Sequence, residues 1–137
     1  MIDSRKLEDL YPKVAGLCQA FIDACIASGI KVSITSTYRD AEYQNALYAK
    51  GRTAPGIIVT KAKGGQSMHN WQVAFDFVPL DANGKPDWGN TKAFEQCGKI
   101  AQSLGLEWGG SWKFKDMPHC QFTGGLTITD FQEGKRI

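Results

Sequence analysis

Apolar residues near the N-terminus recur with the spacing of one helix face. The positions i, i+3, i+4, i+7, i+8 and i+11 are occupied by Val14, Leu17, Cys18, Phe21, Ile22 and Cys25. Pro12 precedes this pattern and suits the first turn of a helix, where its missing N–H leaves no bond unmade. Gly29 follows the pattern as a C-terminal stop. The spacing therefore predicts a helix from Pro12 to about Ser28.

Two further helices are predicted downstream. Residues 30–37 alternate β-branched and small side chains and predict a strand. Asp40 can then cap a second helix that ends at Gly51, and a third helix runs from about Thr91 to Leu104. The side chains expected to face inward are Tyr43, Ala46 and Leu47 in the second helix and Phe94, Cys97, Ala101 and Leu104 in the third.

Three more segments have the character of strands: residues 73–80, 106–108 and 119–122. Helices and short strands mix without a regular βαβ rhythm, which favours the α+β class. With 137 residues and no internal repeat or Pro- or Ser-rich linker, we expect one compact domain with a small antiparallel sheet flanked by about three helices.

Composition and charge narrow the function. The net charge is +2 and the basic residues are scattered, so nucleic-acid binding, which needs a clustered basic surface, has little support. No apolar run reaches the length of about 18 residues that spans a membrane. The first nine residues mix both charge signs and do not form a signal peptide. The cysteines contain no C-x-x-C pair and are expected to be buried core residues: Cys18, Cys25, Cys97 and Cys120.

The two histidines of the chain each follow an unusual loop. Residues 52–66 form a Gly-, Lys- and Thr-rich loop that ends shortly before His69, and residues 109–118 carry aromatic side chains on a Gly-bearing loop before His119. A carboxylate lies at a short offset from each histidine, Asp76 after the first and Asp116 before the second.

Two histidines and one aspartate match the ligand set of a catalytic zinc, which keeps three protein ligands and one open position. Asp76 lies in an apolar run and needs a cation partner if it is buried. A buried salt bridge to an arginine is the alternative for Asp76, and ordinary core or surface positions are the alternative for the histidines. Spacing by itself leaves these alternatives open.

Three blocks of the chain resemble zinc peptidases that cut bacterial cell-wall peptides, a family of D-Ala-D-Ala carboxypeptidases, dipeptidases and phage L-alanyl-D-glutamate endopeptidases. The resemblance covers nearly the whole chain in the right order. The first block has Ser36-Thr37-Tyr38-Arg39-Asp40, Gln44, Leu47-Tyr48 and Gly51-Arg52-Thr53. The second has Gly64-Gly65-Gln66-Ser67, His69 and Asn70. The third has Leu106-Glu107-Trp108-Gly109-Gly110, Trp112, Phe114, Asp116, Pro118, His119 and Gln121.

The resemblance implies a role for each matching residue. It implies one Zn²⁺ per chain, held by His69, Asp76 and His119. Asp116 would be the catalytic base, with Glu107 as the competing candidate, and Arg39 would stabilise the developing oxyanion or hold substrate. Supporting or substrate-binding roles would fall to Gln44, Ser67 and Trp112.

Three residues depart from the family pattern. Ser111 occupies a position that is often charged in relatives, so contacts with the substrate would differ there. Gln72 stands where the family usually has Gly, so a backbone with positive φ would be strained there. Cys120 replaces the usual aromatic residue after the second histidine, and strand alternation points it away from the metal and into the core.

The resemblance implies an enzyme that hydrolyses peptidoglycan stem peptides at the L-Ala–D-Glu bond, as a phage or prophage endolysin. The alternatives are a D-Ala-D-Ala carboxypeptidase and a non-catalytic zinc-bearing binding module, against which Asp116 and Arg39 argue. A glycosidase would leave both histidines unexplained. We expect a monomer that consists of the catalytic domain alone, without a cell-wall-binding domain. It would be made in the host cytoplasm and reach the wall through a separate permeabilising protein.

Overall fold

The computed structural model describes all 137 residues. The α-helices are α1 (Pro12–Ala27), α2 (Ala41–Ala49), α3 (Thr91–Ser103) and α4 (Ile128–Gln132). The strands are β1 (Val32–Ser36), β2 (Ala74–Pro79), β3 (Glu107–Trp108) and β4 (His119–Gln121). Three short 3-10 helices complete the fold: η1 (Leu7–Asp9), η2 (Met68–Trp71) and η3 (Gly109–Ser111). None of the helices is both long enough and apolar enough to cross a membrane.

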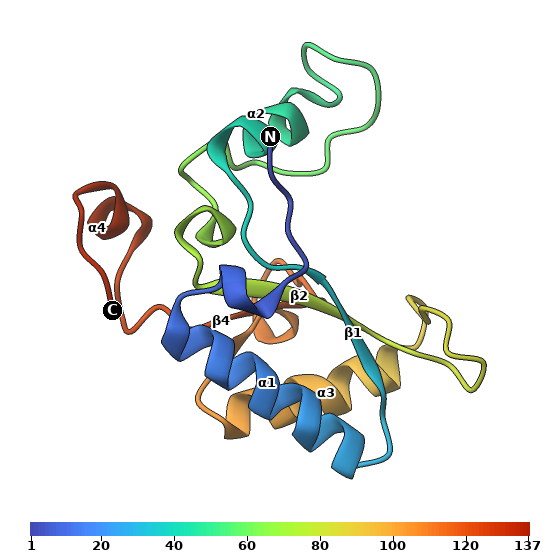
Figure 1. The fold of residues 1–137 in the computed structure, drawn as a ribbon. Coiled ribbons are helices and arrows are strands. Elements are labelled where there is room, and N and C mark those ends of the chain that lie inside the picture. Colours follow the sequence, from blue (N-terminus) through green and yellow to red (C-terminus); the bar gives the residue numbers. More distant parts are fainter.

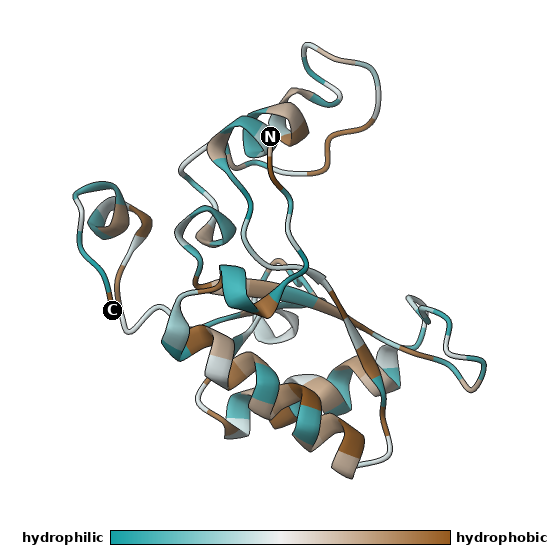
Figure 2. Ribbon diagram, in the orientation of Figure 1, coloured by the Kyte–Doolittle hydropathy of each residue, from teal (hydrophilic) through white to brown (hydrophobic).

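The strands form one antiparallel sheet in the order β1-β2-β4-β3. Helices α1 and α3 cover one face of this sheet, while α2, η2 and the loop between them lie on its other side (Figure 1). Apolar segments recur along α1, α3 and the strands (Figure 2). The core lies between these helices and the sheet, where the Phe21 ring of α1 packs 5.5 Å from Phe75 and 5.0 Å from Phe77.

The structure confirms the α+β class and the predicted helices and strands, with ends shifted by a few residues at most. All four cysteines are free and buried, as expected, and Cys120 belongs to the core. The sequence analysis did not predict α4, whose buried Phe131 stacks on Trp71 at 6.0 Å. This helix is only five residues long, so its periodicity is too short to be recognised.

One prediction of an inward-facing side chain was wrong. In α2, Ala46 is exposed and Gln44 is the buried residue, at 1% exposure. Leu104, just after α3, is partly buried and packs against the core, as predicted. Gln44 is inside because its amide bonds with Arg39 and with the backbone of Ala62, which hydropathy cannot reveal.

The strand register brings distant polar residues together. Asp76 of β2 lies opposite Ser36 of β1 on one side and opposite His119 of β4 on the other. Side chains alternate along a strand, so Asp76 and His119 share the sheet face that α1 and α3 do not cover. The sheet therefore presents a carboxylate and an imidazole beside each other.

Gln72 ends η2 in the left-handed conformation, with φ 65°, and is the only residue other than glycine with positive φ. Its side-chain amide donates to the carbonyl of Asp9 at 2.8 Å, and its own carbonyl accepts from the N–H of Tyr11 at 2.9 Å. The strain expected at this position is present. These two bonds hold the conformation and tie η2 to the N-terminal segment.

Candidate metal centre and active site

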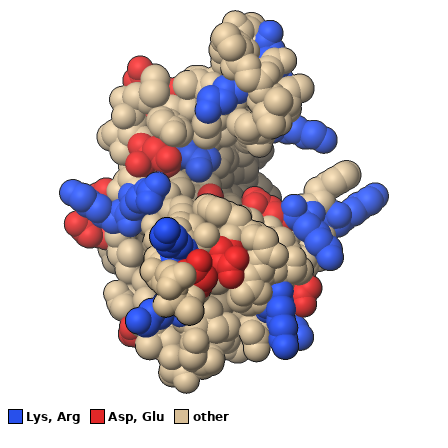
Figure 3. Space-filling model, turned by 90° about the vertical axis from the view of Figure 1, so that its right-hand side faces the viewer, with Lys and Arg blue, Asp and Glu red and all other residues tan.

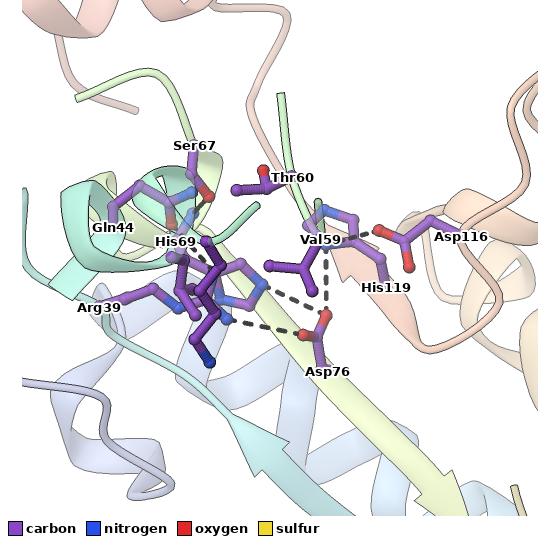
Figure 4. Close-up of a pocket in the computed structure, with 11 residues that line it drawn as sticks. Arg39, Gln44, Val59, Thr60, Ser67, His69, Asp76, Asp116 and His119 are labelled. Atoms are coloured by element: carbon purple, nitrogen blue, oxygen red, sulfur yellow. Dashed lines mark hydrogen bonds and ion pairs between the residues drawn. The ribbon is translucent and has the colours of Figure 1, made fainter. Parts of the chain in front are cut away.

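Three side chains from separate elements converge on one point above the sheet. His69 comes from η2, Asp76 from β2 and His119 from β4. His69 Nε2 lies 3.2 Å from Asp76 Oδ1, and His119 Nδ1 lies 3.3 Å from the same oxygen (Figure 4). Both imidazoles are almost fully buried, whereas the Asp76 carboxylate keeps 24% of its surface exposed.

The outer nitrogen of each imidazole has a fixed hydrogen-bond acceptor. His69 Nδ1 donates to the carbonyl of Thr37 at 2.8 Å, and His119 Nε2 donates to Gln121 Oε1 at 2.8 Å. The Gln121 amide is itself oriented, because its Nε2 donates to Glu107 Oε2 at 3.2 Å. In the neutral rings these bonds leave the lone pairs of His69 Nε2 and His119 Nδ1 directed at Asp76.

This arrangement fits a zinc ion. Zn²⁺ binds nitrogen and oxygen at about 2.0–2.1 Å, and a tetrahedron with such bonds separates its ligand atoms by roughly 3.3 Å. The separations of 3.2 and 3.3 Å match that value, and all three candidate ligand atoms lie within 4.8 Å of one another. Two nitrogen lone pairs directed at a carboxylate oxygen repel that oxygen unless a cation lies between them. Two imidazole nitrogens and one carboxylate oxygen are suitable ligands for such a cation.

The electrostatics of the site also favour a cation. Burial disfavours the ionised carboxylate of Asp76. When the imidazoles of His119 and His69 carry a proton toward it instead of a lone pair, their hydrogen bonds and positive charge hold its pKa well below the ordinary value. Burial likewise disfavours a charged His119 ring, yet Asp76, with smaller contributions from Gln121 and Asp116, raises its pKa. Asp76 is thus anionic at neutral pH and attracts positive charge.

Asp116 and Arg39 lie on opposite sides of the three converging residues. Asp116 Oδ2 is 3.9 Å from His119 Nδ1, and desolvation at the edge of the cleft raises the pKa of its carboxyl. Arg39 Nη2 is 4.0 Å from Asp76 Oδ2, the oxygen that faces away from the histidines. Asp76 therefore has both partners that the sequence analysis left open, the histidines at one oxygen and an arginine at the other.

Hydrogen bonds hold Arg39 in place. Its Nη1 donates to Gln44 Oε1 at 3.0 Å and its Nη2 to Ser36 Oγ at 3.2 Å. Gln44 in turn donates to the carbonyl of Ala62 at 2.8 Å and so links the arginine to the long loop after α2. The guanidinium is thereby oriented toward the site.

Ser67 and Trp112 occupy the edge of the same region. Ser67 caps η2, and its hydroxyl accepts from the backbone N–H of His69 at 3.3 Å, which fixes the start of the histidine-bearing turn. The Trp112 ring lies 5.3 Å from the His119 ring and is 37% exposed. The structure thus brings together the predicted site residues Arg39, Gln44, Ser67, His69, Asp76, Trp112, Asp116 and His119.

A cavity of about 390 Å³ opens over the three converging side chains. Its lining consists of Arg39, Gln44, Leu47, Lys50, Val59, Thr60, Ser67, His69, Asp76, Asp116 and His119. Glu107 does not line this cavity, because it lies on β3 and bonds with Gln121 and Thr123. Asp116 is therefore the better placed of the two candidate bases.

Residues 7–122 match the model of the family VanY, described as D-alanyl-D-alanine carboxypeptidase. The chain belongs to this family. It is 42% identical, over 122 residues, to the peptidoglycan L-alanyl-D-glutamate endopeptidase CwlK of Bacillus subtilis, a match that covers 82% of this chain and 73% of that protein.

Two further comparisons bear on the VanY-family chain. It is 37% identical to the L-alanyl-D-glutamate peptidase of Listeria phage A118 over 74% of its own length and 34% of the phage protein. A crystal structure of the vancomycin resistance D,D-pentapeptidase VanY, an E175A mutant in complex with Zn(II), superposes with a TM-score of 0.62 at 15% identity, covering 90% of this chain and 83% of the other. The latter likeness shows that the fold is shared.

Sequence reasoning missed four contributors to the site. The carbonyl of Thr37 has no side-chain signal, and its role follows only from the approach of β1 to η2. Lys50, Val59 and Thr60 line the cavity because the loop after α2 folds back over it. The length and composition of that loop were the only signal that could have pointed to them.

Proposed function

We propose that this chain is a zinc-dependent endopeptidase that hydrolyses the L-Ala–D-Glu bond of peptidoglycan stem peptides. The observation that carries the proposal is the convergence of His69, Asp76 and His119 beneath an open cavity that Asp116 also lines. The identity of 42% to an L-alanyl-D-glutamate endopeptidase supports the choice of bond.

His69 Nε2, Asp76 Oδ1 and His119 Nδ1 would hold the zinc ion, one per chain. Zinc bound there would activate a water molecule and polarise the scissile carbonyl. Asp116 would accept a proton from the attacking water and then pass it to the leaving amine. Arg39 would stabilise the negative charge that develops on the carbonyl oxygen.

The same proposal covers the role of the whole chain. The described residues act as one catalytic domain and as a monomer, and their place of action is the bacterial cell wall. The similarity to an L-alanyl-D-glutamate peptidase of a phage supports the use of this activity in lysis. Release from the host cytoplasm through a separate permeabilising protein is part of the proposal.

End-group analysis of digested peptidoglycan tests the proposed bond. Purified walls are incubated with the zinc-loaded protein, and new amino termini are labelled and identified by mass spectrometry. We expect a new amino group on D-Glu and a fall in the turbidity of the wall suspension. A digest in which no D-Glu amino terminus can be labelled would contradict the proposal.

The family description favours a second candidate, a D-alanyl-D-alanine carboxypeptidase. That activity uses the same zinc ligands but removes only a terminal residue, so it leaves the cross-linked mesh intact. The same digest separates the two candidates, because the carboxypeptidase releases free D-Ala and leaves the turbidity nearly unchanged.

A further inference from the structure

Positive charge is concentrated on the two segments that border the cavity. We call residues 50–63 the first lip and residues 112–116 the second lip. The chain has 16 basic and 14 acidic side chains. The lips carry six of the basic side chains and only one acidic side chain, that of Asp116. The basic ones are Lys50, Arg52, Lys61 and Lys63 on the first lip and Lys113 and Lys115 on the second. The rest of the molecule therefore carries a net negative charge.

Figure 3 shows how this charge is displayed. Lys and Arg side chains stand on the lobe that overhangs a hollow in the surface and on the body of the molecule beside that hollow. Lys50 belongs to the lining of the cavity itself. The other five stand along the two bordering segments, so an entering ligand meets positive charge before it reaches the two histidines.

None of the six basic side chains lies within 4.0 Å of a carboxylate. Aromatic rings support four of them instead. Arg52 and Lys63 lie 3.9 and 5.3 Å from the centre of the Tyr48 ring. Lys61 and Lys113 lie 5.4 and 5.9 Å from the centre of Phe114, whose ring is 78% exposed. A ring supports a cation without neutralising it, so these groups keep their capacity to bind an anion.

The Phe114 ring also joins the two lips. Lys61 comes from the first lip and Phe114 from the second, so their contact closes the border of the cavity at one point. Exposed apolar side chains accompany the positive charge on the first lip, with Ile57 and Ile58 at 78% and 58% exposure. A ligand that fits this border is an extended chain with carboxylates and short apolar groups.

We infer that the lips recognise free carboxylates of the stem peptide on the leaving-group side of the scissile bond. The inference rests on the proposed function. Where D-Glu is linked to the next residue through its γ-carboxyl group, its α-carboxylate stays free. This carboxylate is attached to the same carbon atom as the nitrogen that the cleavage releases. Of the six basic side chains of the lips, only that of Lys50 lines the cavity, so we assign this carboxylate to Lys50. A peptide whose carboxylate is replaced by a carboxamide has the same shape but offers no charge to the lips.

A matched pair of peptides tests the inference. Both contain L-Ala-γ-D-Glu-L-Lys, and they differ only in a free α-carboxylate or a carboxamide on D-Glu. We expect kcat/KM to be higher for the carboxylate peptide by about three- to tenfold at low salt, and the ratio to fall as salt screens the charges. Lys50→Gln, and separately Lys113→Gln with Lys115→Gln, should lower this ratio about two- to fivefold.

Two exposed lysines of α3, on the opposite side of the sheet, supply the control. Lys92→Gln combined with Lys99→Gln removes the same charge as the double variant of the second lip and should leave the ratio at its wild-type value. A wild-type ratio near one, or an equal fall for both peptides in the lip variants, would overturn the inference. Co-sedimentation with cell walls rich in phosphate polymers gives a further check. If the lip variants lose this co-sedimentation and keep the wild-type ratio, the lips bind those polymers and the inference is overturned.

The failure of the proposed function gives a different result. If neither peptide yields a D-Glu amino terminus and walls release D-Ala, the endopeptidase assignment is wrong, and the inference about the lips falls with it. If both peptides are cut at the L-Ala–D-Glu bond with equal kcat/KM, the assignment stands and only the inference about the lips is wrong.

Discussion

At the scale of single residues, the site depends on which nitrogen of each imidazole is free. The acceptors at Thr37 and Gln121 decide this, so His69 presents Nε2 and His119 presents Nδ1. One acceptor is a backbone carbonyl, which no side-chain substitution removes. The other is an amide side chain, so it is open to a direct test.

Gln121→Leu should weaken zinc binding without removing a ligand. The substitution keeps the side-chain volume but leaves the Nε2–H of His119 without an acceptor, so the ring is free to turn. We expect an affinity loss of about 10–100-fold, measured by competition with a chromophoric chelator. Gln102→Leu on the exposed side of α3 is the matched control. Unchanged affinity in Gln121→Leu would show that packing alone orients His119.

Asp116→Asn should separate metal binding from catalysis. Because Asp116 lines the cavity beside His119 but is not one of the three converging ligands, the variant should keep one zinc per chain. Loss of the general base should lower kcat by about 10²–10⁴-fold. Metal analysis and turnover on the same preparation check both parts. Near-wild-type turnover in Asp116→Asn, with the loss found in Glu107→Gln instead, would transfer the role to Glu107.

At the scale of elements, the close packing of α3 on the sheet depends on a glycine, which has no side chain to obstruct the contact. Gly98 of α3 and Gly110 of η3 both lie against the Trp108 ring, and a Cβ at either position would overlap it. The Trp108 indole N–H donates to the carbonyl of Met117 at 2.8 Å. The ring is therefore fixed and cannot move aside. The fixed ring sets the distance between β3 and α3. It thereby also positions Glu107 of β3, which accepts a hydrogen bond from Gln121.

Alanine at two helical glycines should therefore have opposite effects. Gly98→Ala forces a methyl group into the Trp108 ring and should lower the free energy of unfolding by about 1–3 kcal/mol. Gly16 lies in α1 with no atom near its missing Cβ, so Gly16→Ala should raise the free energy of unfolding by about 0.5–1 kcal/mol. Urea denaturation of both variants provides the measurement. Destabilisation by both, to a similar extent, would contradict the packing argument.

At the scale of the whole molecule, the proposed metal centre joins segments that are far apart in the chain. The three converging side chains come from η2, β2 and β4, and Thr37, directly after β1, supplies the acceptor for His69. The unfolded chain does not hold these groups together. An ion that binds only the folded arrangement therefore stabilises the fold as a whole.

Removal of zinc should lower the melting temperature of the protein. An ion present at 100 times its dissociation constant contributes about 2.7 kcal/mol to the free energy of unfolding, and chelation removes this contribution. We expect a lower Tm in calorimetry with a chelator and its recovery when zinc is added back. His69→Ala should show neither change. If the chelator changes neither the Tm nor the activity of the wild-type protein, the zinc assignment is contradicted.

The sequence by itself determined the local elements and the residue types from which the site is built. Helices α1 and α3 were predictable because their signals are local: apolar spacing with Pro12 before the first of them, and a glycine just beyond each. The proposed ligands His69, Asp76 and His119 could be named from their residue types and the family resemblance.

Only the tertiary structure decided how those groups meet. Three contacts join residues that are distant in sequence. Asp76 pairs with His119, the carbonyl of Thr37 accepts from His69, and the first lip folds over the cavity. Gln44 is buried for the same reason, because its partners Arg39 and Ala62 come from outside its helix. Such contacts are set by strand register and loop path, which arise when the chain packs around one core, so local pattern does not encode them.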